Sequence, residues 1–121
     1  MMRVIAGTAK QRTLKTVPQA FGVRPILARI KKSLFDILAP RTKGALFLDL
    51  YAGSGAVGIE ALSRGAKGVT FVDKRFACLE VIRVNVARLG FADRARWVKA
   101  DATKPLAGWD GPYDLVFMGP P

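Results

Sequence analysis

The sequence contains no histidine and only one cysteine, Cys78, among 121 residues. Catalysis by a histidine acid or base, an internal disulfide and a thiolate metal site are therefore excluded, and a reducing compartment is the simplest setting. No apolar run approaches the roughly 20 residues that span a bilayer. The first residues also lack the apolar block of a secretory signal. These absences predict a cytoplasmic protein with no metal and no membrane partner.

Acidic residues are scarce as well. Nine Asp and Glu stand against 20 Lys and Arg, which gives a formal net charge of +11. The first acid is Asp36, and eight cations precede it: Arg3, Lys10, Arg12, Lys15, Arg24, Arg29, Lys31 and Lys32. Such a segment binds phosphates in a salt-dependent way, so we expect a polyanion partner. Generic solubility is the alternative explanation of the charge.

The N-terminal part reads as a small basic arm over residues 1–22. Two β-prone runs, 3–6 and 13–17, flank a turn and predict a hairpin. We expect five cations of this region to contact RNA phosphates: Arg3, Lys10, Arg12, Lys15 and Arg24. The alternative is an edge hairpin whose lysines merely block aggregation.

A helix is predicted before the first strand of the second region, 23–121. Pro25 suits a first helical turn, and Pro40 is expected to end the helix. The residues expected to face the core recur every four positions: Ile26, Ile30, Leu34 and Leu38. The cations on the rest of the helix are expected to face solvent: Arg29, Lys31 and Lys32.

Strands and helices then alternate. Strands are predicted at 46–50, 69–73, 96–100 and 115–118, with helices from about 56 to Gly65 and over about 75–89. The second of these helices is expected to bury a stripe of apolar residues: Phe76, Leu79, Ile82, Val86 and Leu89. This order predicts an α/β fold with a parallel sheet and right-handed crossovers.

The stretch 46–58, LFLDLYAGSGAVG, is the most informative part of the sequence for function. It reads as a buried strand, a glycine turn and the start of a helix, with Gly53, Gly55 and Gly58 at G-x-G-x-x-G spacing. Asp73 stands twenty residues after Gly53, at the end of the next strand, where an acid meets ribose hydroxyls. This frame predicts a cofactor that contains adenosine. A glycine-rich turn beside a solvated aspartate is the alternative.

Asp49 argues against a dinucleotide cofactor. It lies four residues before Gly53, where its carboxylate would repel a pyrophosphate. S-adenosylmethionine has no phosphate and offers an ammonium and a sulfonium, which suit a carboxylate. A structural role, in which Asp49 accepts hydrogen bonds from loop amides, is the alternative and can coexist with the first.

Polar or glycine residues stand at the carboxyl ends of the predicted strands: Asp49, Asp73, Asp101 and Gly119. In open α/β sheets, ligands bind beyond the carboxyl ends of the strands. Asp101, with Ala102 beside it, is therefore a candidate for contact with adenine. Its alternative role is the N-cap of the following turn.

Residues 48–66, LDLYAGSGAVGIEALSRGA, closely resemble the cofactor motif of bacterial 16S rRNA guanine-N2 methyltransferases of the RsmD type. Further stretches similar to that family are 3–7, 24–25, 32–38, 72–74, 99–102 and 113–117. The resemblance implies a Rossmann-like class I S-adenosylmethionine-dependent methyltransferase that acts on 16S rRNA or on a small-subunit assembly intermediate. The cofactor residues that it implies are Asp49, Ala52, Gly53, Ser54, Gly55, Gly58, Asp73, Lys74, Asp101 and Ala102.

The chain departs from the family at the catalytic motif, Asn/Asp-Pro-Pro-Tyr/Phe. Gly119, Pro120 and Pro121 stand there, and no aromatic residue follows. Acceptors held against the guanine amine help to localise its lone pair, and an aromatic ring stacks on the flipped base. We therefore expect impaired catalysis in a chain that is shortened at its C-terminus. Strand 115–118 would then be an exposed edge, open to self-association.

Two other functions remain open. One is a non-catalytic RNA-binding or ribosome-assembly protein that retains the cofactor fold. The other is a nicotinamide-dependent oxidoreductase, which Asp49 disfavours.

Overall fold

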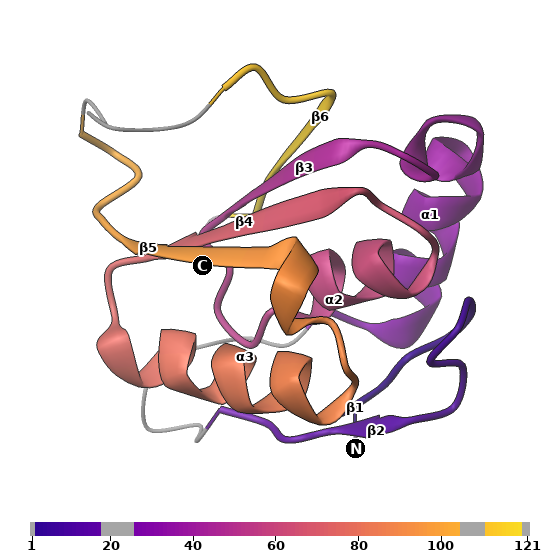
Figure 1. Cartoon of the computed structure of the whole chain (residues 1–121), viewed down its shortest axis with the longest axis horizontal. Coiled ribbons are helices and arrows are strands. Elements are labelled where there is room, and N and C mark those ends of the chain that lie inside the picture. The colour runs from indigo at the N-terminus through magenta and orange to yellow at the C-terminus, as the bar shows by residue number, and fades with distance from the viewer. Residues whose placement is uncertain (1, 18–25, 105–110, 120–121) are drawn as a thin grey trace.

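The computed structural model describes residues 2–17, 26–104 and 111–119 (Figure 1). The strands are β1 (Met2–Arg3), β2 (Thr13–Leu14), β3 (Leu46–Leu50), β4 (Gly68–Asp73), β5 (Ala95–Lys99) and β6 (Leu115–Met118). The helices are α1 (Ala28–Thr42), α2 (Ala56–Ser63), α3 (Phe76–Arg88) and the short 3₁₀ helix η2 (Ala92–Arg94). β1 and β2 pair antiparallel, and the other strands form a parallel sheet. The predicted α/β fold with a small N-terminal hairpin is confirmed.

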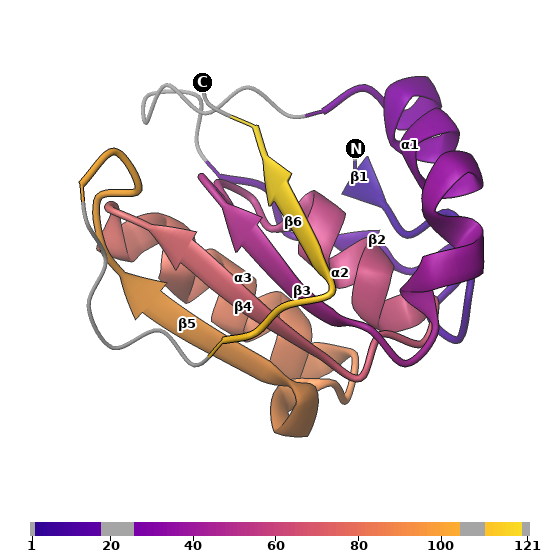
Figure 2. The same ribbon diagram turned by 90° about the horizontal axis from the view of Figure 1, so that it is seen from above.

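The order of the sheet places a ligand crevice beside β3. The four strands lie in the order β5-β4-β3-β6, so the chain steps outward from β3 to β5 and then returns to the other side of β3 (Figure 2). This reversal is a topological switch point, and the crevice that binds ligands in such sheets opens there, at the carboxyl ends of the strands. The glycine loop after β3 lies at this point.

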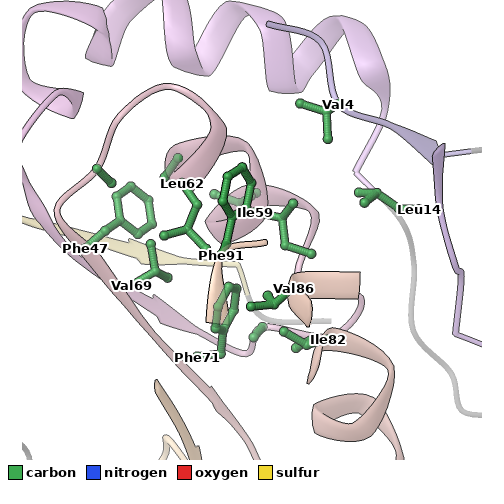
Figure 3. Close-up of a cluster of buried hydrophobic side chains, with 14 of the residues drawn as sticks. Val4, Leu14, Phe47, Ile59, Leu62, Val69, Phe71, Ile82, Val86 and Phe91 are labelled. Carbon is green, nitrogen blue, oxygen red and sulfur yellow. The ribbon is translucent and has the colours of Figure 1, made fainter. Parts of the chain in front are cut away.

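The main core lies on one face of the sheet. There, Phe47, Val69 and Phe71 meet Ile59 and other buried side chains of α2 and α3 (Figure 3). Each such apolar side chain stabilises the fold by roughly 1.5–3 kcal/mol when fully buried. The hairpin forms a further layer beyond α2 and α3 (Figure 1), and it adds its own buried side chains to the core: Val4, Ala9 and Leu14.

The opposite face carries a smaller cluster around Leu48, Leu50 and Val72, in which no residue of the described α-helices takes part. On β6, at one edge of the sheet in the described part of the chain, Val116 is 56% and Met118 62% exposed. The expected exposed apolar strand is therefore present, and self-association through it stays a prediction.

The hairpin is bound to α2 and α3 by buried side chains. Glu60, which has no exposed surface, accepts hydrogen bonds from the backbone N–H groups of Ile5 (2.9 Å) and Ala6 (3.0 Å). Buried Asn85 of α3 binds the backbone of Lys15 on both sides, accepting from its N–H at 2.8 Å and donating to its C=O at 2.9 Å. The arm therefore has a defined position over the two helices that flank the glycine loop.

Helix α1 differs from its predicted pattern. Ile30 is 50% exposed, whereas Lys31 and Phe35 are buried. The inward face is rotated because the Phe35 ring stacks on Phe47, with centroids 6.5 Å apart, and Lys31 forms a 3.3 Å ion pair with Glu60. The expectation that Ile30 faces the core and Lys31 faces solvent was wrong.

The prediction that Pro40 ends this helix was also wrong, because α1 continues to Thr42. Pro40 has no backbone N–H to donate, and the helix ends only two residues after it. In α3, Phe76 is 65% exposed rather than part of the buried stripe, because it is the first residue of the helix. The inner face begins instead at Cys78, which is a small core residue as expected.

Candidate cofactor-binding site

The glycine loop connects β3 to α2 through left-handed backbone. Gly53 has φ 57° and Gly55 φ 78°, and the Gly55 N–H closes the turn onto the Ala52 carbonyl at 2.8 Å. A Cβ on Gly55 would lie 2.7 Å from Ile82 Cγ1, and one on Gly58 would lie 2.3 Å from Phe71 Cε1. The motif therefore serves the turn at its first glycine and close packing of α2 at its last.

Asp49 points inward from β3 and is 2% exposed. Its Oδ2 accepts the N–H of Gly58 at 3.1 Å, which confirms the structural role considered above. Burial raises the pKa of Asp49 to about 7. The Gly58 hydrogen bond lowers this pKa in part, and the negative charge of Asp73 raises it slightly. Within the described ranges, Oδ1 accepts no hydrogen bond and no cation forms a salt bridge with this carboxylate.

Asp73, at the end of β4, is 3% exposed and has many partners. Its Oδ1 accepts from the backbone N (2.8 Å) and Nε (3.0 Å) of Arg75. Its Oδ2 accepts from the Gly53 N–H (2.9 Å) and from Arg75 Nη2 (3.2 Å). Burial pushes the pKa of Asp73 upward, but the Arg75 side chain and the two backbone donors outweigh it and hold this pKa below its usual range.

Asp101 follows β5 and caps a turn. Its Oδ1 accepts from the Thr103 N–H at 2.9 Å and from the Thr103 hydroxyl at 2.6 Å, and the hydroxyl bond is the main reason that the pKa of Asp101 is lowered. The alternative role as the cap of the following turn is confirmed. Contact of Asp101 and Ala102 with adenine stays a prediction.

Gly119 follows β6, on the other side of β3 from Asp73. A Cβ at this position would lie 2.8 Å from Cε2 and 3.1 Å from Cζ of Phe117. Any side chain at position 119 therefore requires the Phe117 ring to shift. Pro120 and Pro121 lie outside the described residues.

The structure brings the predicted strand-end residues to one edge of the parallel sheet. The Gly53–Asp73 hydrogen bond joins the ends of β3 and β4 directly. The glycine-loop residues of the predicted cofactor site are all buried: Ala52, Gly53, Ser54, Gly55 and Gly58. Lys74, by contrast, is exposed.

Sequence reasoning missed Arg75 and the network around Glu60. Arg75 is the N-cap residue of α3 but forms no side-chain cap. An arginine where Ser, Thr, Asp or Asn is usual was the available signal that its side chain has another role. Glu60 binds Lys31 and Arg64, the latter at 2.8 Å. Its apolar neighbours, Ile59 and Ala61, were the signal that this acid is buried.

Four of the five arm cations assigned to RNA are exposed: Arg3, Lys10, Arg12 and Lys15. Arg24 lies outside the described residues. Arg12 Nη2 donates to the carbonyl of Arg88 at 3.4 Å, which links the arm to the end of α3. A groove of about 430 Å³ runs between the arm and α3, and its lining includes Lys15, Phe76 and Val81.

The residues that the structure describes include no group of three or more histidine, cysteine or acidic side chains able to hold a metal ion. None of the described helices combines the length and apolar character needed to cross a membrane.

Comparisons with known proteins give consistent results. The family model described as conserved hypothetical protein 95 matches residues 2–121. Ribosomal RNA small subunit methyltransferase D of Escherichia coli K12 is 41% identical over 120 residues, which cover 99% of this chain and 60% of that protein. YlbH of Bacillus subtilis, provisionally described as an rRNA methyltransferase, is 37% identical over 123 residues, which cover 99% of this chain and 66% of that protein.

A solved structure of yhhF from Escherichia coli, provisionally described as a methyltransferase, superposes with a TM-score of 0.86 at 38% identity. The match covers 99% of this chain and 64% of that one. The chain therefore spans between 60% and 66% of the length of these relatives.

Proposed function

This chain belongs to the family described as conserved hypothetical protein 95, and from that premise we propose that it binds S-adenosylmethionine and serves the methylation of small-subunit ribosomal RNA. Relatives that match 99% of the chain are named for ribosomal RNA methylation. One observation carries the cofactor part of the proposal. The Asp49 carboxylate is buried at the switch point of the sheet, and no cation of the described chain forms a salt bridge with it.

The residues at the carboxyl ends of β3, β4 and β5, namely Asp49, Asp73 and Asp101, form a rim whose chemistry fits this cofactor. A buried carboxylate without a counter-charge is costly, and a ligand ammonium next to Asp49 would relieve that cost. When bound, S-adenosylmethionine supplies a methyl group that its sulfonium makes electrophilic. Asp49 and the loop 52–55 would hold the methionine end, Asp73 the ribose hydroxyls, and Asp101 with Ala102 the adenine.

A nicotinamide dinucleotide fits the same rim poorly. Its pyrophosphate would bring negative charge to the glycine loop, close to a carboxyl whose pKa is already raised to about 7. A further negative charge would force Asp49 to remain protonated. The donor set therefore favours a ligand that is cationic at this end.

We propose the exocyclic N2 of a guanine as the methyl acceptor, following the family resemblance. Gly119 presents no side-chain acceptor to that amine. Loss of one preorganised partner typically costs on the order of a hundredfold or more in rate. Methyl transfer by this chain is therefore expected to be slow.

The exposed cations of the arm support an RNA partner. An rRNA substrate in turn implies a cytoplasmic location for this chain. Arg12 and Lys15 lie on a hairpin that Glu60, Asn85 and Arg88 hold in place. Such a fixed basic surface binds phosphates without first paying the entropy of ordering the arm. Each phosphate contact adds to the salt dependence of binding.

The proposal is tested by calorimetric titration of the purified chain with S-adenosylhomocysteine, followed by transfer of labelled methyl groups to unmodified small ribosomal subunits. Saturable binding, with slow transfer that a Gly119→Asn variant accelerates, is the expected result. Because position 119 lies against Phe117, a Gly119→Asn, Phe117→Leu variant is included to leave room for the new side chain. A folded chain that fails to bind S-adenosylhomocysteine would overturn the cofactor assignment.

The absence of a side chain at Gly119 also favours a second candidate, a non-catalytic RNA-binding or assembly protein that keeps the cofactor fold. It predicts tight RNA binding that falls steeply with salt, and no methyl transfer by the wild-type chain or by either Gly119 variant. The same two assays therefore separate the candidates.

A further inference from the structure

Asp73, the residue expected to bind the ribose, has no acceptor position left. An ionised carboxylate offers about four lone-pair sites, two on each oxygen. Arg75 N and Nε share Oδ1, while Gly53 N and Arg75 Nη2 share Oδ2, all within 3.2 Å. A ribose hydroxyl that donates to Asp73 must therefore replace one of these donors.

Arg75 is the donor that can move. The Gly53 and Arg75 backbone N–H groups belong to the glycine loop and to the start of α3, so they are fixed by the fold. The Arg75 side chain is 27% exposed, against 2% for Asp73, and it folds back from the N-cap position, where the backbone is extended. Rotation of this side chain frees one site on each oxygen and leaves both backbone bonds in place.

We propose that Arg75 determines how tightly this chain binds its cofactor, because its guanidinium occupies Asp73 in the free protein and must yield to the ribose hydroxyls. The inference rests on the proposed function, and it names the residue that opposes cofactor binding within that site. Two vicinal hydroxyls replace the two guanidinium bonds one for one. A ligand without these hydroxyls leaves the guanidinium where it is.

The test is the affinity of Arg75→Ala for S-adenosylhomocysteine, measured by calorimetry beside the wild-type chain. With the competitor removed, the variant is expected to bind about threefold to tenfold more tightly, as suits a partly exposed ion pair. Arg75→Lys, which keeps the charge but loses the fork of donors, is expected to fall between the two. It also keeps the test valid if the alanine variant does not fold.

A matched control removes a cation from the same helix without touching Asp73. Arg83 pairs with Glu80 on the surface of α3, so Arg83→Ala is expected to leave the affinity unchanged within twofold. A 2′,3′-dideoxy analogue of S-adenosylhomocysteine separates competition for Asp73 from general repulsion. Its affinity is expected to be the same for the wild-type chain and for Arg75→Ala.

Each outcome decides the inference. Equal or weaker binding by Arg75→Ala, with normal binding by the wild-type chain, would show that Arg75 does not compete and would overturn it. A gain shared by the dideoxy analogue or by Arg83→Ala would also overturn it, in favour of long-range charge. If neither the wild-type chain nor any Arg75 variant binds, the proposed function fails, and the inference fails with it.

Discussion

Asp49 and Asp73 lie at the carboxyl ends of adjacent strands and are almost equally buried, yet their pKa values move in opposite directions. Burial favours the neutral form of both. In the part of the chain that the structure describes, Asp49 has only the Gly58 N–H to oppose burial, and its pKa rises to about 7. Asp73 has two backbone donors and the Arg75 guanidinium, and its pKa falls. Burial therefore dominates the pKa of Asp49, whereas at Asp73 the hydrogen-bond donors outweigh burial.

The difference supports our proposal that the two carboxyls contact different ends of a ligand. Asp49 lacks a counter-charge in the described structure, so a cationic group is the partner that stabilises its ionised form. Asp73 is already balanced by Arg75, so a ligand gains there only by exchanging hydrogen bonds. S-adenosylmethionine has both kinds of group, an ammonium at one end and a ribose diol in the middle.

The largest effect is expected when the charge of Asp49 is removed. Asp49→Asn keeps an acceptor for the Gly58 N–H but offers no charge to a ligand ammonium. Loss of one partner of a buried charge pair costs about 2–5 kcal/mol, so binding of S-adenosylhomocysteine at pH 8 is expected to weaken at least thirtyfold. Calorimetry measures this, and the control is Asp36→Asn, at an exposed position of α1. Unchanged affinity would remove Asp49 from the site.

The same variant is expected to change the pH dependence of stability. The pKa of Asp49 is 3.8 in the unfolded chain and about 7 in the folded one, so the folded state holds more protons between these values. Its contribution therefore makes stability fall as pH rises from about 4 to 7, with a slope of up to about 1.4 kcal/mol per pH unit. Asp49→Asn has no proton to lose.

Urea unfolding of both proteins from pH 5 to 8 measures this contrast. The variant is expected to be more stable than the wild-type chain at pH 5, by a margin that grows up to about pH 7 and then stays constant to pH 8. The carboxyls with lowered pKa values, Asp73, Glu80 and Asp101, are ionised throughout this range and do not contribute. A wild-type chain that is as stable as the variant at pH 8 would mean that Asp49 is not penalised by burial.

Asp73→Asn is expected to have the opposite sign. The amide keeps one acceptor oxygen but leaves Arg75 and one backbone donor poorly satisfied, which costs about 1–3 kcal/mol at pH 7. The low pKa of Asp73 means that its contribution is complete above pH 3.8 and is lost as pH falls through the folded value. Urea unfolding at pH 7 and at pH 3 tests this. A loss that persists undiminished at pH 3 would point to packing rather than charge.

The fold and the chain positions of the rim follow from local patterns. The predicted strands 46–50 and 115–118 agree with β3 and β6 because each is an apolar run between turn residues. Strand ends then locate Asp49 and Asp73 without any three-dimensional information, since parallel strands share one carboxyl edge.

The partners of these residues do not follow from local patterns. Lys31 looked solvent-facing because its ion-pair partner, Glu60, lies 29 positions away and on another helix. Arg75 is only two residues from Asp73, but the carboxylate that it binds also accepts the N–H of Gly53, which lies 20 positions earlier in the chain. The opposite pKa shifts of Asp49 and Asp73 therefore needed the structure.

The smallest effect is expected at the second arginine–carboxylate pair of α3. Arg83 and Glu80 form the same kind of contact as Arg75 and Asp73, but both of their side chains are more than 40% exposed. Solvent and salt screen such a pair, so Arg83→Ala is expected to leave the unfolding midpoint unchanged at pH 7, whereas Arg75→Ala lowers it. Thermal unfolding at low and at 0.5 M salt measures both. The two pairs differ in the burial of Asp73. An equal drop in unfolding midpoint for both variants would mean that this burial adds nothing to the strength of the Arg75–Asp73 ion pair.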